Sequence, residues 1–72
     1  MIEFETTYRE TLVRRGDEWI QKDFRDLKRG ETFRLRDADT GTIVSDEGGI
    51  DTWKASTNAT LGENGVYYVE IM

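Results

Sequence analysis

Apolar and polar residues alternate with a period of two along several short stretches of this 72-residue chain, which is the pattern of half-buried β-strands. The first stretch runs from Ile2 to Tyr8, and its alternation becomes less regular between residues 11 and 13. Gly16 follows within a group of charged residues and can adopt the positive φ of a tight turn. We therefore predict a hairpin that pairs roughly Ile2–Val13 with Glu18–Lys22.

A single helical turn is predicted over residues 23–29. Asp23 is a suitable N-cap, and Phe24 and Leu27 stand three residues apart on one face. The segment is too short to be a stable α-helix. We expect a 3₁₀ or irregular turn that ends at Gly30.

Four more strands are predicted in the rest of the chain, each bounded by residues that favour turns. They cover Thr32–Arg36, Thr42–Ser45, Asp51–Ala55 and Val66–Ile71. Asp, Asn and Gly are concentrated between them, and Asn64-Gly65 is the strongest short signal for a hairpin turn. Short strands, close turns and the lack of a long helical pattern predict one all-β domain over 1–72, either a small five-stranded barrel or a rolled antiparallel sheet.

The core has to form from few residues, because a domain of this size buries only about 60% of the surface that it exposes when unfolded. The absence of Cys leaves no disulfide to stabilise it. We expect both tryptophans to be buried or half-buried, and an exposed one would be a natural contact for a partner. The predicted core comprises Phe4, Trp19, Ile20, Phe24, Leu27, Phe33, Leu35, Ile43, Trp53, Leu61, Val66, Val69, Ile71 and the tyrosines.

Histidine and cysteine are both absent, which removes the usual general base, the thiolate nucleophile and the commonest metal ligands. The segment from Asp37 to Glu47 is close to a calcium loop, but Gly41 comes one residue too early for an EF-hand. We interpret it as a turn, with weak metal binding as the alternative. Asp46, Glu47 and Asp51 surround a Gly-Gly pair that favours an exposed loop, so acid–base catalysis is not expected there. We expect a protein that is not an enzyme and has neither a metal nor another cofactor.

Charge is distributed unevenly along the chain, whose net charge is −5. Residues 1–36 contain nine basic and eight acidic side chains, whereas residues 37–72 contain seven acidic side chains and only Lys54 as a base. An acidic second half repels nucleic-acid backbones and favours basic partners, although it also serves simple solubility. In the first half, the interleaved acidic residues favour salt-bridged hairpins over a nucleic-acid interface.

No apolar run in the chain approaches the length of a membrane span. Glu3, Glu5 and Glu10 interrupt the N-terminal region where an export signal would need apolar residues. We therefore expect a cytoplasmic protein without membrane contact, and a monomer.

Two stretches resemble the Src-homology-3 family. Leu27–Leu35 is similar to the family's diverging turn, in which an apolar residue precedes two lysines, Gly, Glu and an alternating strand. Trp53-Lys54-Ala55 and Gly62–Tyr67 resemble its Trp strand and the Gly-x-x-Gly turn that leads into the closing strand. The resemblance implies a small β-barrel and, for a peptide-binding member, a groove containing Trp53. Only Trp53 maps onto a groove position and the chain has no Pro, so the resemblance supports the barrel and leaves the ligand open.

The short length, the acidic character and the spacing of Phe24, Leu27, Gly30 and Phe33 also resemble small proteins encoded by bacterial viruses. We therefore favour a non-catalytic protein-binding module, a small regulator or inhibitor that docks on a larger host machine such as RNA polymerase or a nuclease. Two alternatives stay open: a Src-homology-3-type peptide-recognition module, and a protein that binds single-stranded nucleic acid through its basic first half.

The candidate binding residues form two groups. The N-terminal strand can add to the edge of a partner's sheet, and acidic side chains with one tryptophan can face a basic surface. The residues are Ile2, Glu3, Phe4 and Glu5 in the first group and Asp46, Glu47, Asp51 and Trp53 in the second.

Overall fold

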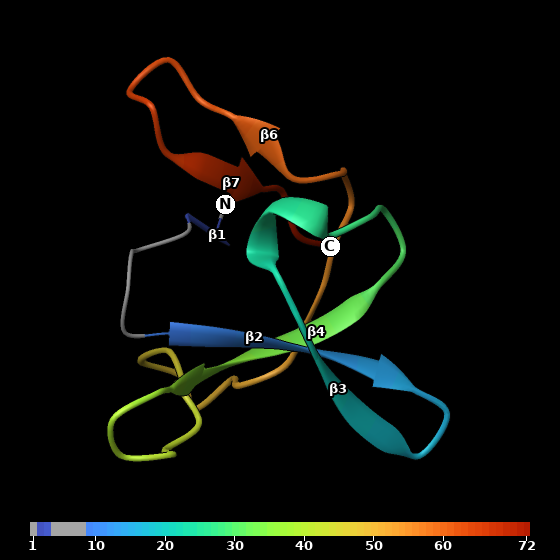
Figure 1. Ribbon diagram of the computed structural model, residues 1–72, viewed down its shortest axis with the longest axis vertical. Helices are drawn as coiled ribbons and strands as arrows, with labels where there is room; N and C mark the ends of the chain where they lie inside the picture. The colour runs from blue at the N-terminus through green and yellow to red at the C-terminus, as the bar shows by residue number, and fades with distance from the viewer. Residues whose placement is uncertain (1, 4–8) are drawn as a thin grey trace.

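The computed structural model describes residues 2–3 and 9–72, and these residues form the all-β fold that the alternation predicts. They contain seven short strands in two antiparallel sheets (Figure 1). The larger sheet has the order β3-β2-β4-β5 and the smaller one the order β1-β7-β6, and the described strands do not close into a barrel. The elements are β1 (Ile2–Glu3), β2 (Arg9–Arg15), β3 (Glu18–Lys22), the 3₁₀ turn η1 (Phe24–Asp26), β4 (Thr32–Asp37), β5 (Trp53–Lys54), β6 (Thr60–Leu61) and β7 (Tyr67–Val69).

The β2–β3 hairpin is the most regular part of the fold. Five residue pairs join its strands, and the connecting turn contains Gly16 with a φ of 61°. This pairing confirms the predicted hairpin from Arg9 onward. The prediction that the same strand includes Ile2 is wrong, because β1 pairs with β7 in the smaller sheet. Residues 11–13 are all buried, so β2 is covered on both faces and loses its alternation. Residues 4–8 lie outside the described part.

A compact corner, residues 23–31, connects this hairpin to β4. The side chain of its N-cap residue, Asp23, accepts a hydrogen bond from the backbone N–H of Arg25 at 2.9 Å. A tight turn over Lys28–Glu31 follows, in which the last N–H donates to the first carbonyl at 3.1 Å. Gly30 has a φ of 90° at the third position, which is the geometry of a type II turn. The predicted helical turn is confirmed as a 3₁₀ turn, but the prediction that it ends at Gly30 is wrong. It ends at Asp26 with Leu27 as its C-cap, and Gly30 bends the separate turn that follows.

The corner is bonded to a segment much later in the chain. The N–H of Gly30 donates to the carbonyl of Ala55 at 2.8 Å, and the N–H of Ala55 donates to the carbonyl of Glu31 at 2.9 Å. The N–H of Ala59 donates to the carbonyl of Leu27, also at 2.9 Å. The corner and the Trp-Lys-Ala stretch, which carry much of the resemblance described above, therefore lie next to each other.

Side chains from both sheets and from the corner form the core. Phe33 packs edge-on against Phe24, with ring centres 6.4 Å apart, and lies 5.9 Å from the ring of Trp53. The buried members are Val13, Phe24, Leu27, Phe33, Leu35, Trp53, Ala55 and Val69. Val13 and Ala55 are absent from the predicted core, the first because the alternation fails around it and the second because its side chain is small.

Two residues of the predicted core are exposed instead. Ile20, 47% exposed, lies on edge strand β3, and Leu61, 57% exposed, lies on edge strand β6. An edge strand has a neighbour on one side only, which leaves these side chains in contact with water. Trp19 is half-buried, and the guanidinium of Arg34 lies 4.2 Å from the centre of its ring. Phe4 lies outside the described residues.

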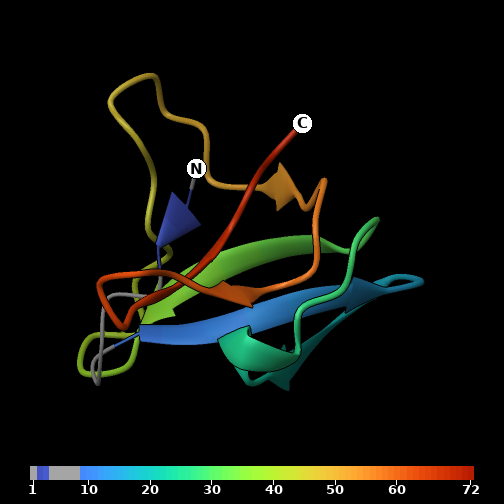
Figure 2. The ribbon, with the colours of Figure 1, turned by 90° about the horizontal axis from the view of Figure 1, so that it is seen from above.

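Loops dominate the second half of the chain. β5 has two residues, and the predicted strand Thr42–Ser45 is wrong, since only an isolated bridge forms there, at Ile43. The physical reason lies in the next loop. One carboxylate oxygen of Asp46 accepts hydrogen bonds from the N–H groups of Gly48 and Ile50, both at 2.9 Å, and these bonds curl the chain back on itself. Figure 2 shows this loop standing away from the four-stranded sheet.

The other two predicted turns are confirmed. In the turn after β4, the carboxylate of Asp37 accepts a hydrogen bond from the N–H of Asp39 at 2.9 Å. In the β6–β7 hairpin, the N–H of Gly62 donates to the carbonyl of Val66 at 2.9 Å. The described part of the chain has no helix with the length and apolar character needed to cross a membrane.

Candidate protein-binding site

Four of the eight predicted binding residues line one hollow of about 270 Å³, although they come from two distant parts of the chain, residues 2–3 and 46–53. We call this the Trp53 hollow. The predicted residues in it are Ile2, Glu3, Asp46 and Trp53, and the others are Arg9, Leu35, Val44 and Ser45.

The floor of the Trp53 hollow is apolar. Trp53 pairs with Phe33 in the antiparallel register of β5 and β4, and only 9% of its surface is exposed. Leu35 lies two residues after Phe33 on β4, so the side chains of Phe33 and Leu35 project from the same face of the sheet. Ile2 is held beside them because it pairs with Val69 on β7. The larger sheet and the smaller sheet thus each contribute to this floor.

The rim of the hollow carries carboxylates. Asp46 is exposed, and both hydrogen bonds that its side chain accepts use Oδ1, which leaves Oδ2 without a partner among the described residues. Glu3 is exposed too, and its Oε2 accepts a long hydrogen bond of 3.5 Å from the side chain of Asn64. Arg9 adds one basic side chain to the lining. An apolar floor with acidic groups at its edge is suited to an apolar side chain that is flanked by basic residues.

The remaining predicted binding residues are placed differently. Glu47 and Asp51 are exposed in the same loop as Asp46 but do not line the hollow. Phe4 and Glu5 lie outside the described residues. Prediction from the sequence missed the other four lining residues, which are Arg9, Leu35, Val44 and Ser45. Leu35 was a predicted core residue, and its inward face could have indicated contact with Trp53.

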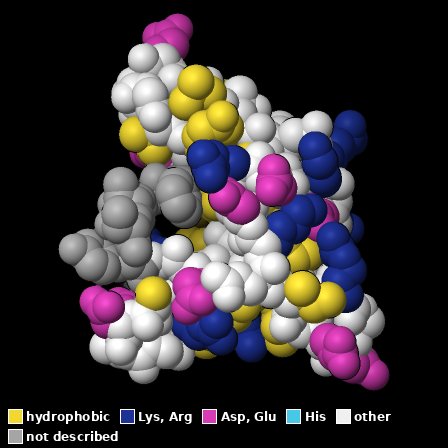
Figure 3. All heavy atoms as spheres, in the orientation of Figure 1, with side chains coloured by type: hydrophobic (Ala, Val, Ile, Leu, Met, Phe, Trp, Pro, Cys, Tyr) yellow, Lys and Arg dark blue, Asp and Glu magenta, His cyan; other side chains and the backbone are white. Residues whose placement is uncertain are grey.

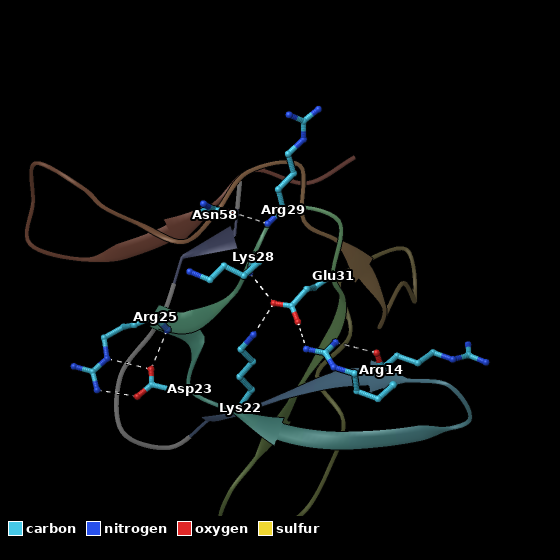
Figure 4. A network of polar contacts seen from close by, with 9 residues as sticks. Arg14, Lys22, Asp23, Arg25, Lys28, Arg29, Glu31 and Asn58 are labelled. Atoms are coloured by element: carbon cyan, nitrogen blue, oxygen red, sulfur yellow. Dashed lines mark hydrogen bonds and ion pairs between the residues drawn. The ribbon is translucent and has the colours of Figure 1, made fainter.

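A second charged region surrounds Glu31, whose side chain is only 10% exposed (Figure 4). Its carboxylate accepts hydrogen bonds from Lys22 at 2.9 Å, from Arg15, and from the backbone N–H of Lys28 at 2.7 Å. Burial alone would raise the pKa of Glu31, but these hydrogen bonds outweigh it and the pKa is lowered. Lys and Arg side chains form a band over the corner and the β2–β3 hairpin, along the right side of Figure 3.

Two further ion pairs lie in the first half of the chain. Arg25 binds Asp23 through two side-chain nitrogens, at 2.8 and 3.1 Å. The side-chain and backbone hydrogen bonds from Arg25 lower the pKa of Asp23 to about 2. Arg36 pairs with Glu10 at 3.2 Å. Four basic residues of this half therefore have acidic partners, as expected for salt-bridged hairpins.

A larger groove of about 570 Å³, which the sequence did not indicate, runs between the two sheets. We call it the inter-sheet groove. It is lined by Arg9, Glu10, Thr11, Gln21, Lys22, Asp23, Phe24, Arg25, Gly65, Val66 and Tyr67. No short motif connects these residues, since the chain brings them together only by folding the β6–β7 hairpin over β2 and β3. In the described part of the chain, no group of three or more acidic residues is placed to hold a metal ion.

No protein-family model, curated protein or solved structure matches this chain. The resemblance to the Src-homology-3 family and to small viral proteins stays a prediction.

Proposed function

We propose that this chain is a non-catalytic protein-binding module that docks its Trp53 hollow on a basic patch of a larger partner. The observation that carries the proposal is the meeting of Ile2, Trp53, Glu3 and Asp46 around one hollow, with apolar groups at the floor and carboxylates at the rim.

The dimensions and charge of the hollow set the chemistry of the contact. A volume of about 270 Å³ accepts a single apolar side chain, and the burial of one such side chain contributes about 1.5–3 kcal/mol. The exposed Glu3 and Asp46 attract lysine or arginine beside it. The net charge of −5 also attracts a basic partner from a distance. This attraction speeds association and becomes weaker as the salt concentration rises.

Surfaces that hold nucleic acid present the basic groups that this contact needs. A small acidic module bound to such a surface blocks it, so an RNA polymerase or a nuclease is the partner class that we favour. Strand β1 is at the edge of its sheet and pairs only with β7 among the described strands. Its outer edge can therefore add to a strand of the partner while the hollow takes a side chain.

The test is a pull-down from bacterial lysate with quantitative mass spectrometry, using two double variants of equal charge. Glu3→Gln with Asp46→Asn removes both rim carboxylates, and the amide that replaces the Asp46 carboxylate keeps the oxygen that accepts from Gly48 and Ile50. Glu47→Gln with Asp51→Asn removes two carboxylates outside the hollow. We expect the wild type and the second variant to enrich a polymerase or nuclease subunit that the first variant loses.

The captured partner is then titrated at increasing salt. The dissociation constant of the wild type is expected to rise steeply with salt, and that of the rim variant to rise much less. Equal binding by the two double variants, or enrichment of no nucleic-acid-processing protein, contradicts the proposal.

A further inference from the structure

The inter-sheet groove has the size of a small-molecule site. Its volume of about 570 Å³ falls within the range of about 300–1,000 Å³ that ligand pockets occupy. It also lies between two separate elements, the β2–β3 hairpin and the β6–β7 hairpin, as many ligand sites do. Arg9 is the only described residue that it shares with the Trp53 hollow.

Aromatic and aliphatic groups form part of its walls. Phe24 lines it from η1, and Val66 and Tyr67 line it from the turn and strand of the β6–β7 hairpin. Val66 and Tyr67 are half-buried, so part of their surface is available to a ligand. A planar ring gains both apolar contact and aromatic packing from such walls.

Arg25 is held at the groove in a geometry that leaves hydrogen-bond donors available. Its Nε and Nη2 bind the two carboxylate oxygens of Asp23, as Figure 4 shows. Nη1 has no partner among the described residues, and 59% of the side chain is exposed. A guanidinium fixed from one side in this way presents paired N–H groups to a phosphate or carboxylate.

The other ion pairs at the groove are balanced in charge. Glu10 and Lys22 line the groove, and their partners are Arg36 and Glu31. The attraction for an anionic ligand therefore comes from Arg25, whose Nη1 is available among the described residues.

We propose that the inter-sheet groove binds a small organic anion in which a planar ring carries a phosphate or carboxylate group. The ring lies against Val66 and Tyr67, and the anionic group meets Arg25. This site is independent of the protein-binding function proposed above.

The test is an NMR titration of the ¹⁵N-labelled full chain at low ionic strength. Phenyl phosphate and benzoate are the two ring anions, inorganic phosphate supplies the anion alone, and phenol supplies the ring alone. Saturable shifts are expected at the amides of Phe24, Arg25 and Gly65 with at least one ring anion, and the amides of Gly48 and Gly49 in the distant loop are expected to stay unmoved. The stronger of the two ring anions identifies the preferred anionic group.

Two variants of equal charge locate the binding. Arg25→Gln removes the guanidinium but keeps the backbone N–H that Asp23 caps, so the fold is retained. Arg14→Gln removes an exposed guanidinium outside the groove, whose hydrogen-bond partner among the described residues is the nearby carbonyl of Gly16. We expect affinity for the ring anion to fall about tenfold in the first variant, the effect of one charged hydrogen bond, and to change little in the second.

A further variant adds charge without removing an ion pair. Gln21 is exposed and lines the groove, so Gln21→Glu is expected to fold normally and to lose the saturable shifts. Saturation by inorganic phosphate or phenol to the same extent as by the ring anions would overturn the proposal. So would the absence of saturation with both ring anions, or equal weakening in the Arg25 and Arg14 variants.

Discussion

The two halves of the chain use their carboxylates in opposite ways. Between residues 9 and 37, Glu10, Asp23 and Glu31 each pair with one or two basic side chains. Between residues 38 and 72, the described structure gives no carboxylate an ion pair, and Asp46 binds only backbone groups of its own loop. The charges of the first half hold strands and corner together, whereas those of the second half are available to a partner.

The same division appears in the backbone. The first half contains β2, β3 and β4, which have five to seven residues each, whereas β5, β6 and β7 have two or three. Loops between the short strands satisfy their own N–H groups through Asp and Asn side chains. Regular strand pairing and ion pairing are thus concentrated in one half, and both halves depend on the core contacts between them.

The largest expected effect tests whether the two sheets unfold together. Val13 on β2 and Val69 on β7 are buried to the same degree, with 1% and 0% exposure, and belong to one core cluster. Val13→Ala and Val69→Ala should each lower the free energy of unfolding by about 2 kcal/mol, from lost burial and the cavity left behind. Chemical denaturation measures both values. A much smaller loss for Val69→Ala would show that the smaller sheet unfolds separately.

The next effect concerns the corner. Gly30 has a φ of 90°, and a Cβ there would meet no atom within 4 Å, so a substitution costs backbone strain alone. Gly30→Ala should lower the free energy of unfolding by about 1 kcal/mol. The matched control is Gly48→Ala in the loop of the second half. The φ of Gly48 is not positive, so an alanine there causes no such backbone strain. Equal melting temperatures for the two variants would contradict the role of Gly30 as the bend of the corner.

Much of the first half could be predicted from its sequence, because local chemistry specifies it. The Asp23 cap, the bend at Gly30 and the inward Phe33 and Leu35 depend on neighbours a few residues away. The placement of β1 beside β7 could not be predicted, since a strand of two residues carries no register signal. The candidate site was partly foreseen through its chemistry. The shape of the Trp53 hollow depends on contacts between distant segments of the chain. The alternation of apolar and polar residues within one strand does not predict such contacts.

The ion pairs of the first half are expected to stabilise the fold to a similar extent, and this stabilisation is expected to be lost when the pH is lowered. Folding lowers the pKa values of Glu31 and Asp23, the latter to about 2. Their contribution to stability is therefore complete above the unfolded values, near pH 4, and is lost as the pH falls through the folded values. Glu31→Gln should cost about 1 kcal/mol at pH 7 and should lose less stability than the wild type between about pH 4 and 2.

Thermal unfolding at several pH values measures this difference. Glu70→Gln, at an exposed position of the second half, is the control and should follow the wild-type profile. If Glu31→Gln kept the full acid sensitivity of the wild type, the network around Glu31 would not be a source of stability.

The smallest expected effect is a gain in stability, from a substitution of Thr11. Thr11 is 3% exposed on β2, and its hydroxyl has no hydrogen-bond partner among the described residues. Thr11→Val replaces this hydroxyl by a methyl group of similar size, so it should raise the free energy of unfolding by about 0.5–1 kcal/mol. Thr60→Val on β6, where the hydroxyl donates to the carbonyl of Asn58 at 3.0 Å, should not stabilise. A lower melting temperature for Thr11→Val would show that its hydroxyl has a partner after all.

The hydrogen bonds from the corner to Ala55 and Ala59 have a consequence for how the molecule acquires its structure. They join residues that are far apart in the sequence, so the corner cannot be completed until the later segment is present. A fragment ending at Asp51 should accordingly show the narrow amide dispersion of an unfolded chain. During synthesis on the ribosome, the first half is therefore expected to fold only after the later segment has been added. A topology with so many nonlocal contacts also folds slowly for its size.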